Sequence, residues 1–166
     1  PGGGWRARSA DGTEIAIQLE GMNFFDQSFF QRLDDSPAGI SGLAGAMGKV
    51  HWAALAHSPW DHAGDAGFWD TLRVKTMELR ERTDRAIMVV VGCNLFEWGT
   101  FLRRMDNFLM DLLAEPEQVE RLLDALMEIH LGTLGKVCKA VGDVADLCRL
   151  GDDLGTDTGP FMAPET

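Results

Sequence analysis

The 166-residue sequence contains no tyrosine, and cysteine and proline are sparse, with three and six residues. The three cysteines have neither disulfide-framework nor metal-site spacing, which is typical of a protein in a reducing compartment. No apolar run is long enough to span a bilayer, and the N-terminus has no signal-peptide pattern. We therefore expect a cytoplasmic protein without a membrane partner.

Positive charge is also in short supply. Lys and Arg number 15 against 26 Asp and Glu, which gives a net charge of −11. Phosphate backbones repel so acidic a chain, and we therefore expect no nucleic-acid partner. The 45% hydrophobic and 25% charged residues are those of a globular protein.

The second half of the sequence alternates between β-branched runs and helical patterns. Residues 86–92 form a continuous β-branched run, and residues 144–150 form a short apolar run, both of strand length. Between them, apolar spacing predicts a helix near 101–113 and a longer one from Pro116 to about residue 141, and another helix is expected over 66–83. The order strand, helix, helix, strand predicts an α/β protein with parallel strands buried on both faces.

The first half is less regular. Residues 5–19 read as a hairpin that turns at Asp11-Gly12. Four phenylalanines within residues 22–30 are spaced as on one face of a helix. We expect one domain over 1–166, with an irregular part at 1–80 that contains the hairpin and helices, and βα units at 81–166.

Three histidines, His51, His57 and His62, lie close together in the sequence and invite a metal hypothesis. Their spacings are not the i, i+4 pattern of a helical zinc site, and Pro59 interrupts the segment. Loop or interface histidines are therefore the favoured interpretation, and we expect no metal site here.

Two adjacent acids, Asp152 and Asp153, follow the second predicted strand after Gly151. Carboxylates where a parallel strand ends can serve acid–base chemistry, bind a cation or orient a substrate. They can equally cap backbone amides in a polar turn. Because neighbours on an extended backbone point in opposite directions, we expect one acid to be catalytic and the other to be a cap.

Three polar residues, Cys93, Asn94 and Glu97, follow the first predicted strand. The carboxyl ends of parallel strands meet at one edge of a sheet, so these side chains are expected near the paired acids, where they would contact substrate. His130 falls near the apolar stripe of the long helix, and a packed histidine is its expected role.

Several stretches form a combined pattern. They are Phe96-Glu97, residues 102–112, Glu115-Pro116-Glu117, the run Gly151-Asp152-Asp153-Leu154-Gly155-Thr156, Gly159-Pro160 and Ala163-Pro164-Glu165. Together they resemble the uroporphyrinogen decarboxylase superfamily, which also includes methyltransferases that move methyl groups between corrinoids and thiols. The resemblance covers residues 81–166 and is weak before them.

The resemblance implies a (β/α)8 TIM-type barrel, typically about 250 residues long. The barrel would then be incomplete in this chain, and we expect the chain to be a segment of a longer protein, inactive by itself. Decarboxylation in this family needs no cofactor. A carboxylate, here Asp152 or Asp153, would stabilise a protonated pyrrole of a tetrapyrrole, and Arg103, Arg104 and Arg149 would hold its acidic arms.

The sequence also departs from the decarboxylases. Their Gly-x-Pro-x-Thr-Leu stretch leads to a catalytic tyrosine, whereas the matching residues 92–97 lead to Thr100 and Phe101. Corrinoid methyl transfer, with a zinc-activated thiol and a corrinoid-protein partner, is therefore the main alternative, and a homodimer or a non-catalytic binding barrel is also consistent with the sequence. The zinc-binding His-x-Cys pair is absent here and would lie beyond Thr166.

Overall fold

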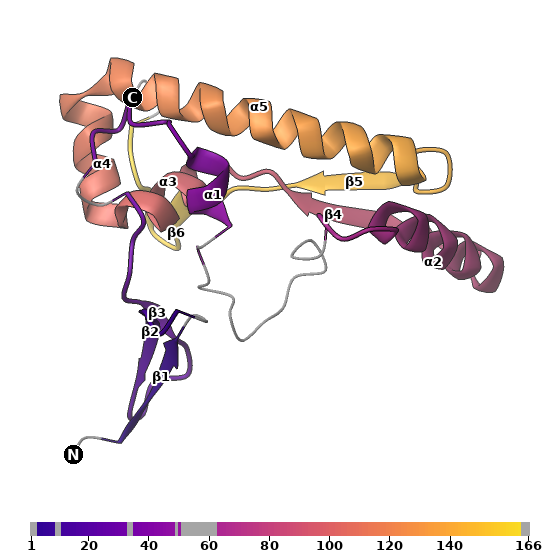
Figure 1. Cartoon of the computed structure of the whole chain (residues 1–166), viewed down its shortest axis with the longest axis horizontal. Helices are drawn as coiled ribbons and strands as arrows, with labels where there is room; N and C mark the ends of the chain where they lie inside the picture. Colours follow the sequence, from indigo (N-terminus) through magenta and orange to yellow (C-terminus); the bar gives the residue numbers. More distant parts are fainter. Residues whose placement is uncertain (1–2, 9–10, 33–34, 49, 51–62, 164–166) are drawn as a thin grey trace.

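The structure is a computed structural model that describes residues 3–8, 11–32, 35–48, 50 and 63–163 (Figure 1). The segment with His51, His57 and His62 lies outside the described residues, so its predicted lack of a metal stays a prediction.

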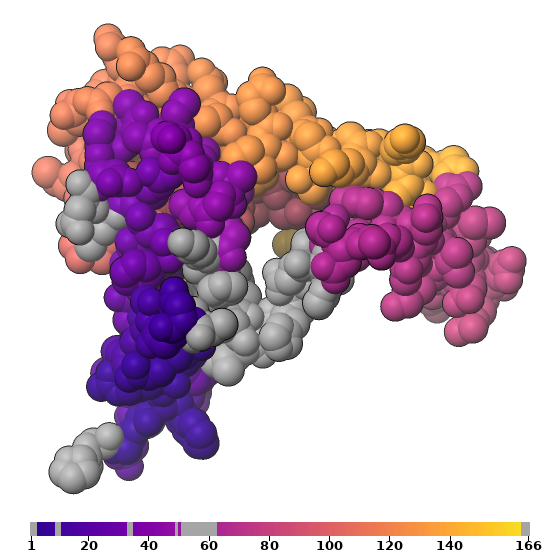
Figure 2. All heavy atoms as spheres, in the orientation of Figure 1, coloured from indigo at the N-terminus to yellow at the C-terminus, as the bar shows by residue number. Residues whose placement is uncertain are grey.

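An antiparallel hairpin forms the N-terminal part and projects from the rest of the molecule (Figures 1 and 2). Strands β1 (Gly4–Arg8) and β2 (Glu14–Leu19) pair across the predicted turn, and β3 (Asp26–Gln27) adds to the other side of β2. Gly12 has φ +88°, a left-handed conformation that glycine adopts without strain. The hairpin prediction is confirmed.

The helical face predicted for residues 22–30 is wrong. The segment contains β3 and no helix, and two of its phenylalanines, Phe24 and Phe29, are 57% and 42% exposed. Its backbone pairs with β2 instead: the Ser28 N–H donates to the Ile15 carbonyl at 2.9 Å. The Gln27 side chain donates to the Phe101 carbonyl at 2.7 Å, so tertiary contacts override the local periodicity.

The helices agree with the sequence pattern. The helix near 101–113 is divided in two at Arg104, whose φ of +65° breaks the helical path. The long helix begins with Pro116 in its first turn, as predicted. The helices of the described residues are α1 (Leu43–Met47), α2 (Phe68–Arg82), α3 (Phe96–Arg103), α4 (Met105–Ala114) and α5 (Pro116–Val141).

Two parallel strands, β4 (Met88–Gly92) and β5 (Leu147–Leu150), lie side by side, as the sequence predicts. A small antiparallel pair, β6 (Gly155–Thr156) and β7 (Gly159–Pro160), follows β5. No sheet formed by the described residues closes on itself. The chain is therefore an α/β protein, and the barrel stays a prediction.

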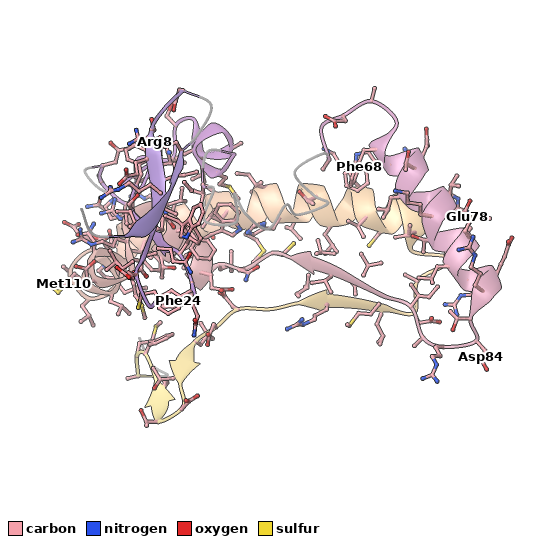
Figure 3. The ribbon with its side chains drawn as sticks, turned by 90° about the horizontal axis from the view of Figure 1, so that it is seen from below. Arg8, Phe24, Phe68, Glu78, Asp84 and Met110 are labelled. Carbon is pink, nitrogen blue, oxygen red and sulfur yellow. The ribbon has the colours of Figure 1, made fainter. Side chains whose placement is uncertain are left out.

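The expectation that both strands are buried on both faces is wrong. Helices α2 and α5 cover one face of the β4–β5 sheet (Figure 3), where Val91 packs against Val137 and Val141. Met88 and Leu147 are more than half exposed, and all four residues of β5 are exposed. Among the described residues no second layer covers β5, so its apolar composition does not reflect burial here.

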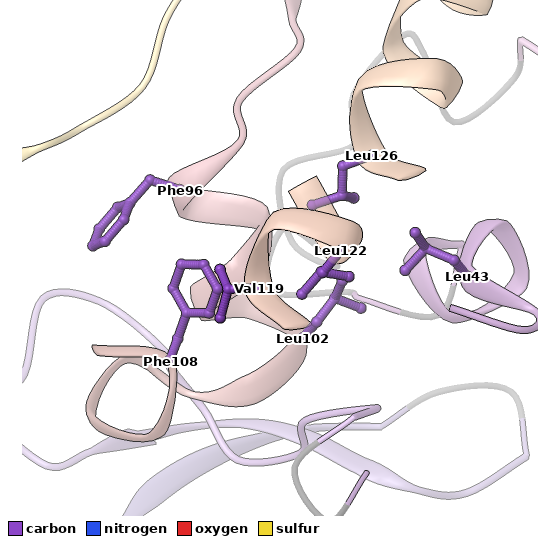
Figure 4. Packing of buried hydrophobic residues seen from close by; sticks show 7 residues of the cluster. All are labelled: Leu43, Phe96, Leu102, Phe108, Val119, Leu122 and Leu126. Atoms are coloured by element: carbon purple, nitrogen blue, oxygen red, sulfur yellow. The ribbon is translucent and has the colours of Figure 1, made fainter. Parts of the chain in front are cut away.

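The main core lies where α1, α3, α4 and α5 meet (Figure 4). Phe96, at the start of α3, packs against Phe108 of α4 and stacks on Phe161, with ring centroids 5.7 and 5.6 Å apart. This packing of three aromatic rings holds the start of α3 against α4. The buried residues of the cluster are Leu43, Phe96, Leu102, Phe108, Val119, Leu122 and Leu126.

Gly99 of α3 allows the close approach of α4. A Cβ atom at this position would lie 2.2–2.6 Å from ring atoms of Phe108. We predict that Gly99→Ala lowers the free energy of unfolding by about 1–3 kcal/mol, because the buried ring must shift.

The control is Gly132→Ala in α5, where an added Cβ meets nothing within 4 Å. Relative to glycine, alanine should there stabilise the helix by up to about 1 kcal/mol. Urea denaturation of both variants measures the difference. Equal stabilities would show that α3 and α4 are not packed as described.

Candidate functional site

We use the term rim for the residues directly after the two parallel strands, 93–97 after β4 and 151–154 after β5. The strands end together, since the Gly151 N–H donates to the Gly92 carbonyl at 3.3 Å. Gly92 and Cys93 have φ of +78° and +59°, so the chain leaves β4 in a sharp bend. A glycine suits position 92 because its left-handed backbone is strained for other residues. The structure thus brings the two predicted loops together.

Asp152 joins the two loops. Its Oδ2 accepts the backbone N–H groups of Leu95 at 2.7 Å and of Phe96 at 2.6 Å, and its Oδ1 accepts that of Glu97 at 2.9 Å. These donors belong to the start of α3, whose own N-cap residue, Leu95, provides no side-chain acceptor. Of the two roles that the sequence left open, the structure shows the cap, and the capped helix lies more than 50 residues earlier in the chain.

Asp153 accepts fewer hydrogen bonds than Asp152. Its side chain is exposed, and its Oδ1 accepts the Gly155 N–H over a long 3.4 Å. The bond is a local turn contact of the kind that Asp residues make two positions ahead. Asp153 is therefore the carboxylate of the pair that is better placed to meet a ligand.

Three predicted site residues gather at the rim. The Asn94 side-chain amide donates to the Glu97 carboxylate, and the Asn94 carbonyl lies 2.9 Å from His130 Nε2. Since a carbonyl only accepts, the imidazole must carry a proton on Nε2. The Cys93 thiol donates to the His130 carbonyl at 3.9 Å. Cys93 and Asn94 thus both contact His130 of α5, and Glu97 is linked to His130 through Asn94.

His130 of α5 contacts the rim, a contact that sequence reasoning missed. It is buried, with 8% exposure, as expected for a packed histidine, but its ring reaches the loop after β4. Burial lowers the pKa of His130, and the Asn94 carbonyl and the Asp152 charge offset this in part. Burial, and then Cys148, raise the pKa of the Cys93 thiol. Both groups are therefore neutral at pH 7.

The three predicted substrate-binding arginines are not at the rim together. Arg103 is 4% exposed, and it donates to the Asp111 carboxylate and to the carbonyls of Arg32 and Asp35. It ends α3, about 10 Å along the helix from Phe96 at 1.5 Å per residue. Its buried guanidinium therefore has a structural role and does not face the rim.

The other two arginines are exposed. Arg104 pairs with Asp106, two residues on, with bonds of 2.6 and 2.8 Å. Arg149 lies on β5 opposite Val90, three residues before Asp152. Of the three, Arg149 is the one that lies next to the rim in the chain.

The rim combines carboxylates with neutral hydrogen-bonding groups. Glu97, Asp152 and Asp153 contribute acids and Cys93 contributes a thiol, and the imidazole of His130 contacts the rim from α5. Within the described part of the chain, no group of three or more His, Cys, Asp or Glu side chains could hold a metal ion. None of the helices there is long and apolar enough to cross a membrane. The arrangement suits proton transfer and the stabilisation of positive charge.

Asp152 should matter for stability. We predict that Asp152→Ala lowers the free energy of unfolding by about 1–2 kcal/mol, because three N–H groups of α3 lose their acceptor. Asp152→Asn should lose less, since its amide oxygen still accepts, and Asp153→Ala should change little. Urea denaturation tests all three, and a loss for Asp153→Ala as large as that for Asp152→Ala would contradict the assignment.

Arg103 should also be structural. We predict that Arg103→Met lowers the free energy of unfolding by about 3–5 kcal/mol, because the half-buried Asp111 carboxylate loses its partner. Arg104→Gln is the matched control, with a neighbouring exposed pair whose loss should have little effect. Thermal and urea denaturation measure both variants, and an equal loss of stability in the two would refute the assignment.

Compared with family models, with curated proteins and with solved structures, the chain has no significant match.

Proposed function

We propose that this chain forms part of a (β/α)8 barrel enzyme of the uroporphyrinogen decarboxylase superfamily, with its active centre at the rim. One observation carries the proposal: two neighbouring parallel strands end in polar loops that meet. In barrel enzymes the catalytic residues come from the loops at the carboxyl ends of the strands.

The placement of the family-like stretches supports this proposal. The run 151–156 forms the loop after β5, and Phe96-Glu97 begins α3. These stretches are more than 50 residues apart in the sequence, yet Asp152 bonds directly to the backbone of both Phe96 and Glu97. The ring of Phe161, just beyond Gly159-Pro160, stacks on Phe96. These parts of the pattern thus lie together in space.

The chemistry assigned to the rim is decarboxylation of a tetrapyrrole without a cofactor. Loss of CO2 from a protonated pyrrole is favoured by a carboxylate that stabilises the positive charge. Asp153 is the group we assign to this role, because the Asp152 oxygens are engaged with α3. Cys93, Asn94 and Glu97 would line the substrate site, and Arg149 would bind an acidic arm.

The arginines favour a second candidate, corrinoid-dependent methyl transfer. Arg103 and Arg104 are engaged with Asp111 and Asp106, so only one of the three predicted arginines remains for a polyanionic tetrapyrrole. The described residues do not fit the zinc of such an enzyme, because His130 Nε2 is bound to the Asn94 carbonyl and no group of three His, Cys, Asp or Glu side chains among them could hold a metal ion. Zinc ligands would have to come from other residues.

The test is turnover by the complete gene product that contains this chain. One assay supplies reduced uroporphyrinogen and measures CO2 release, and the other supplies a methyl-corrinoid with a thiol. We predict that Asp153→Asn lowers kcat about 10²-fold or more, with an unchanged melting temperature.

Asp157→Asn, in the exposed turn between β6 and β7, is the matched control and should keep wild-type turnover. Turnover of neither substrate would refute the proposed function. Full activity of Asp153→Asn on a substrate that is turned over would refute the assignment of this carboxylate.

A further inference from the structure

The N-terminal hairpin has a hollow at the end that points away from the helices (Figure 1). Its volume is about 490 Å³, which falls within the range of small-molecule sites, about 300–1,000 Å³. The lining residues are 3–5, at the start of β1, and 18–22, at the end of β2 and in the turn that follows it. The hollow is therefore separate from the rim and from the function proposed for it.

A glycine creates the space in this hollow. Trp5 lies opposite Gln18 in the antiparallel register, and Gly3, two residues before Trp5, shares the same face of the hairpin. A Cβ atom at Gly3 would lie 3.3 Å from Oε2 of Glu20, so the Glu20 carboxylate reaches over this position. Because Gly3 has no side chain, the space between the Trp5 indole and the carboxylate stays open.

The turn after β2 forms another wall. Gly21 has φ +84°, and the Met22 N–H donates to the Leu19 carbonyl at 3.0 Å, so the chain reverses direction here. The side-chain amide of Gln18 donates to the Met22 carbonyl at 2.7 Å. This bond ties the turn to the strand residue that lies opposite Trp5, so apolar groups of the turn are held beside the indole.

Glu20 gives the hollow its charge, since the other described residues that line it are uncharged. Within the described part of the chain, no hydrogen bond or ion pair engages the Glu20 carboxylate. The two arginines of β1, Arg6 and Arg8, pair with Glu14 instead. A cation that enters the hollow therefore meets a negative charge that these arginines do not neutralise.

Trp5 supplies a second attraction for a cation. Its side chain is 74% exposed, and the face of a Trp ring is the best aromatic partner for a positive charge. A primary ammonium group would bring three N–H donors, each of which needs an acceptor. A quaternary ammonium group has no donor and presents methyl groups, which suit the indole and the apolar side chains of Leu19 and Met22.

We propose that this hollow binds a quaternary ammonium group. Its methyl groups contact Trp5 and Met22, and its charge lies between the indole face and the Glu20 carboxylate. A free small molecule and a lipid headgroup present the same trimethylammonium chemistry to the hollow.

The first test is calorimetric titration of the protein with choline at constant ionic strength. The neutral compound 3,3-dimethyl-1-butanol, which has the shape of choline without its charge, is the matched ligand control. Choline should bind once per chain, and the neutral compound should bind about tenfold more weakly or worse, because both attractions depend on the charge. Binding of phosphatidylcholine vesicles, measured by co-sedimentation, shows whether a lipid headgroup also enters the hollow.

The second test uses variants of the hollow. Trp5→Ala should weaken choline binding about tenfold, and Glu20→Gln several-fold, because each removes one of the two attractions. Phe24→Ala removes an exposed ring outside the hollow, and Glu128→Gln removes an exposed carboxylate of α5, so both should bind choline like the wild type. In the wild type, choline should also shift the NMR signal of the Trp5 indole N–H, a readout that needs no change to the binding residues.

Three results would each overturn the proposal. They are an absence of choline binding to the wild type, equal binding of the neutral compound, and unchanged binding by both Trp5→Ala and Glu20→Gln. No turnover is measured, so failure of the proposed catalytic function leaves these results unaffected.

Discussion

A single carboxylate organises the rim, because Asp152 accepts three backbone N–H groups from the start of α3. This contact fixes the loop after β5 against the loop after β4, two segments that the crossover through α3, α4 and α5 separates in the chain. The charge and the helix dipole favour the same arrangement. The loop after β4 is fixed by the sheet at one end and by Asp152 at the other. This positions its polar residues Cys93, Asn94 and Glu97.

Helix α5 supports this arrangement from the other side. Its first half contributes Val119, Leu122 and Leu126 to the main core, and its second half packs Val137 and Val141 against Val91 of β4. His130 lies between these two sets and bonds to the loop after β4. The hydrophobic packing that stabilises both ends of the helix thus also positions the imidazole at the rim.

The sequence predicts those features that depend on local pattern. The hairpin turn at Asp11-Gly12, the start of α5 at Pro116 and the parallel pairing of β4 with β5 follow from turn chemistry, helix capping and connection rules. Residues 22–30 were predicted wrongly, because the helical spacing of the phenylalanines carries no information about the backbone pairing of β3 with β2. Pairing with β2 determined the secondary structure of that segment.

The residues of the candidate site were predictable as a set, but their individual contacts were not. Parallel strands place Cys93, Asn94, Asp152 and Asp153 near one another from sequence alone. Which acid caps a helix depends on amides 55–57 residues away, and no local pattern contains that information. The same holds for Arg103, whose partners include carbonyls about 70 residues earlier.

The exposure of β5 has a consequence for how the protein behaves at high concentration. Among the described residues β5 is an edge strand, and an uncovered edge can pair with a strand of another molecule. The strand is only four residues long, and Arg149 places a charge within its run of Leu147, Cys148 and Leu150. Short length and a central charge are the features that keep such edges from self-association, so Arg149 also contributes to solubility.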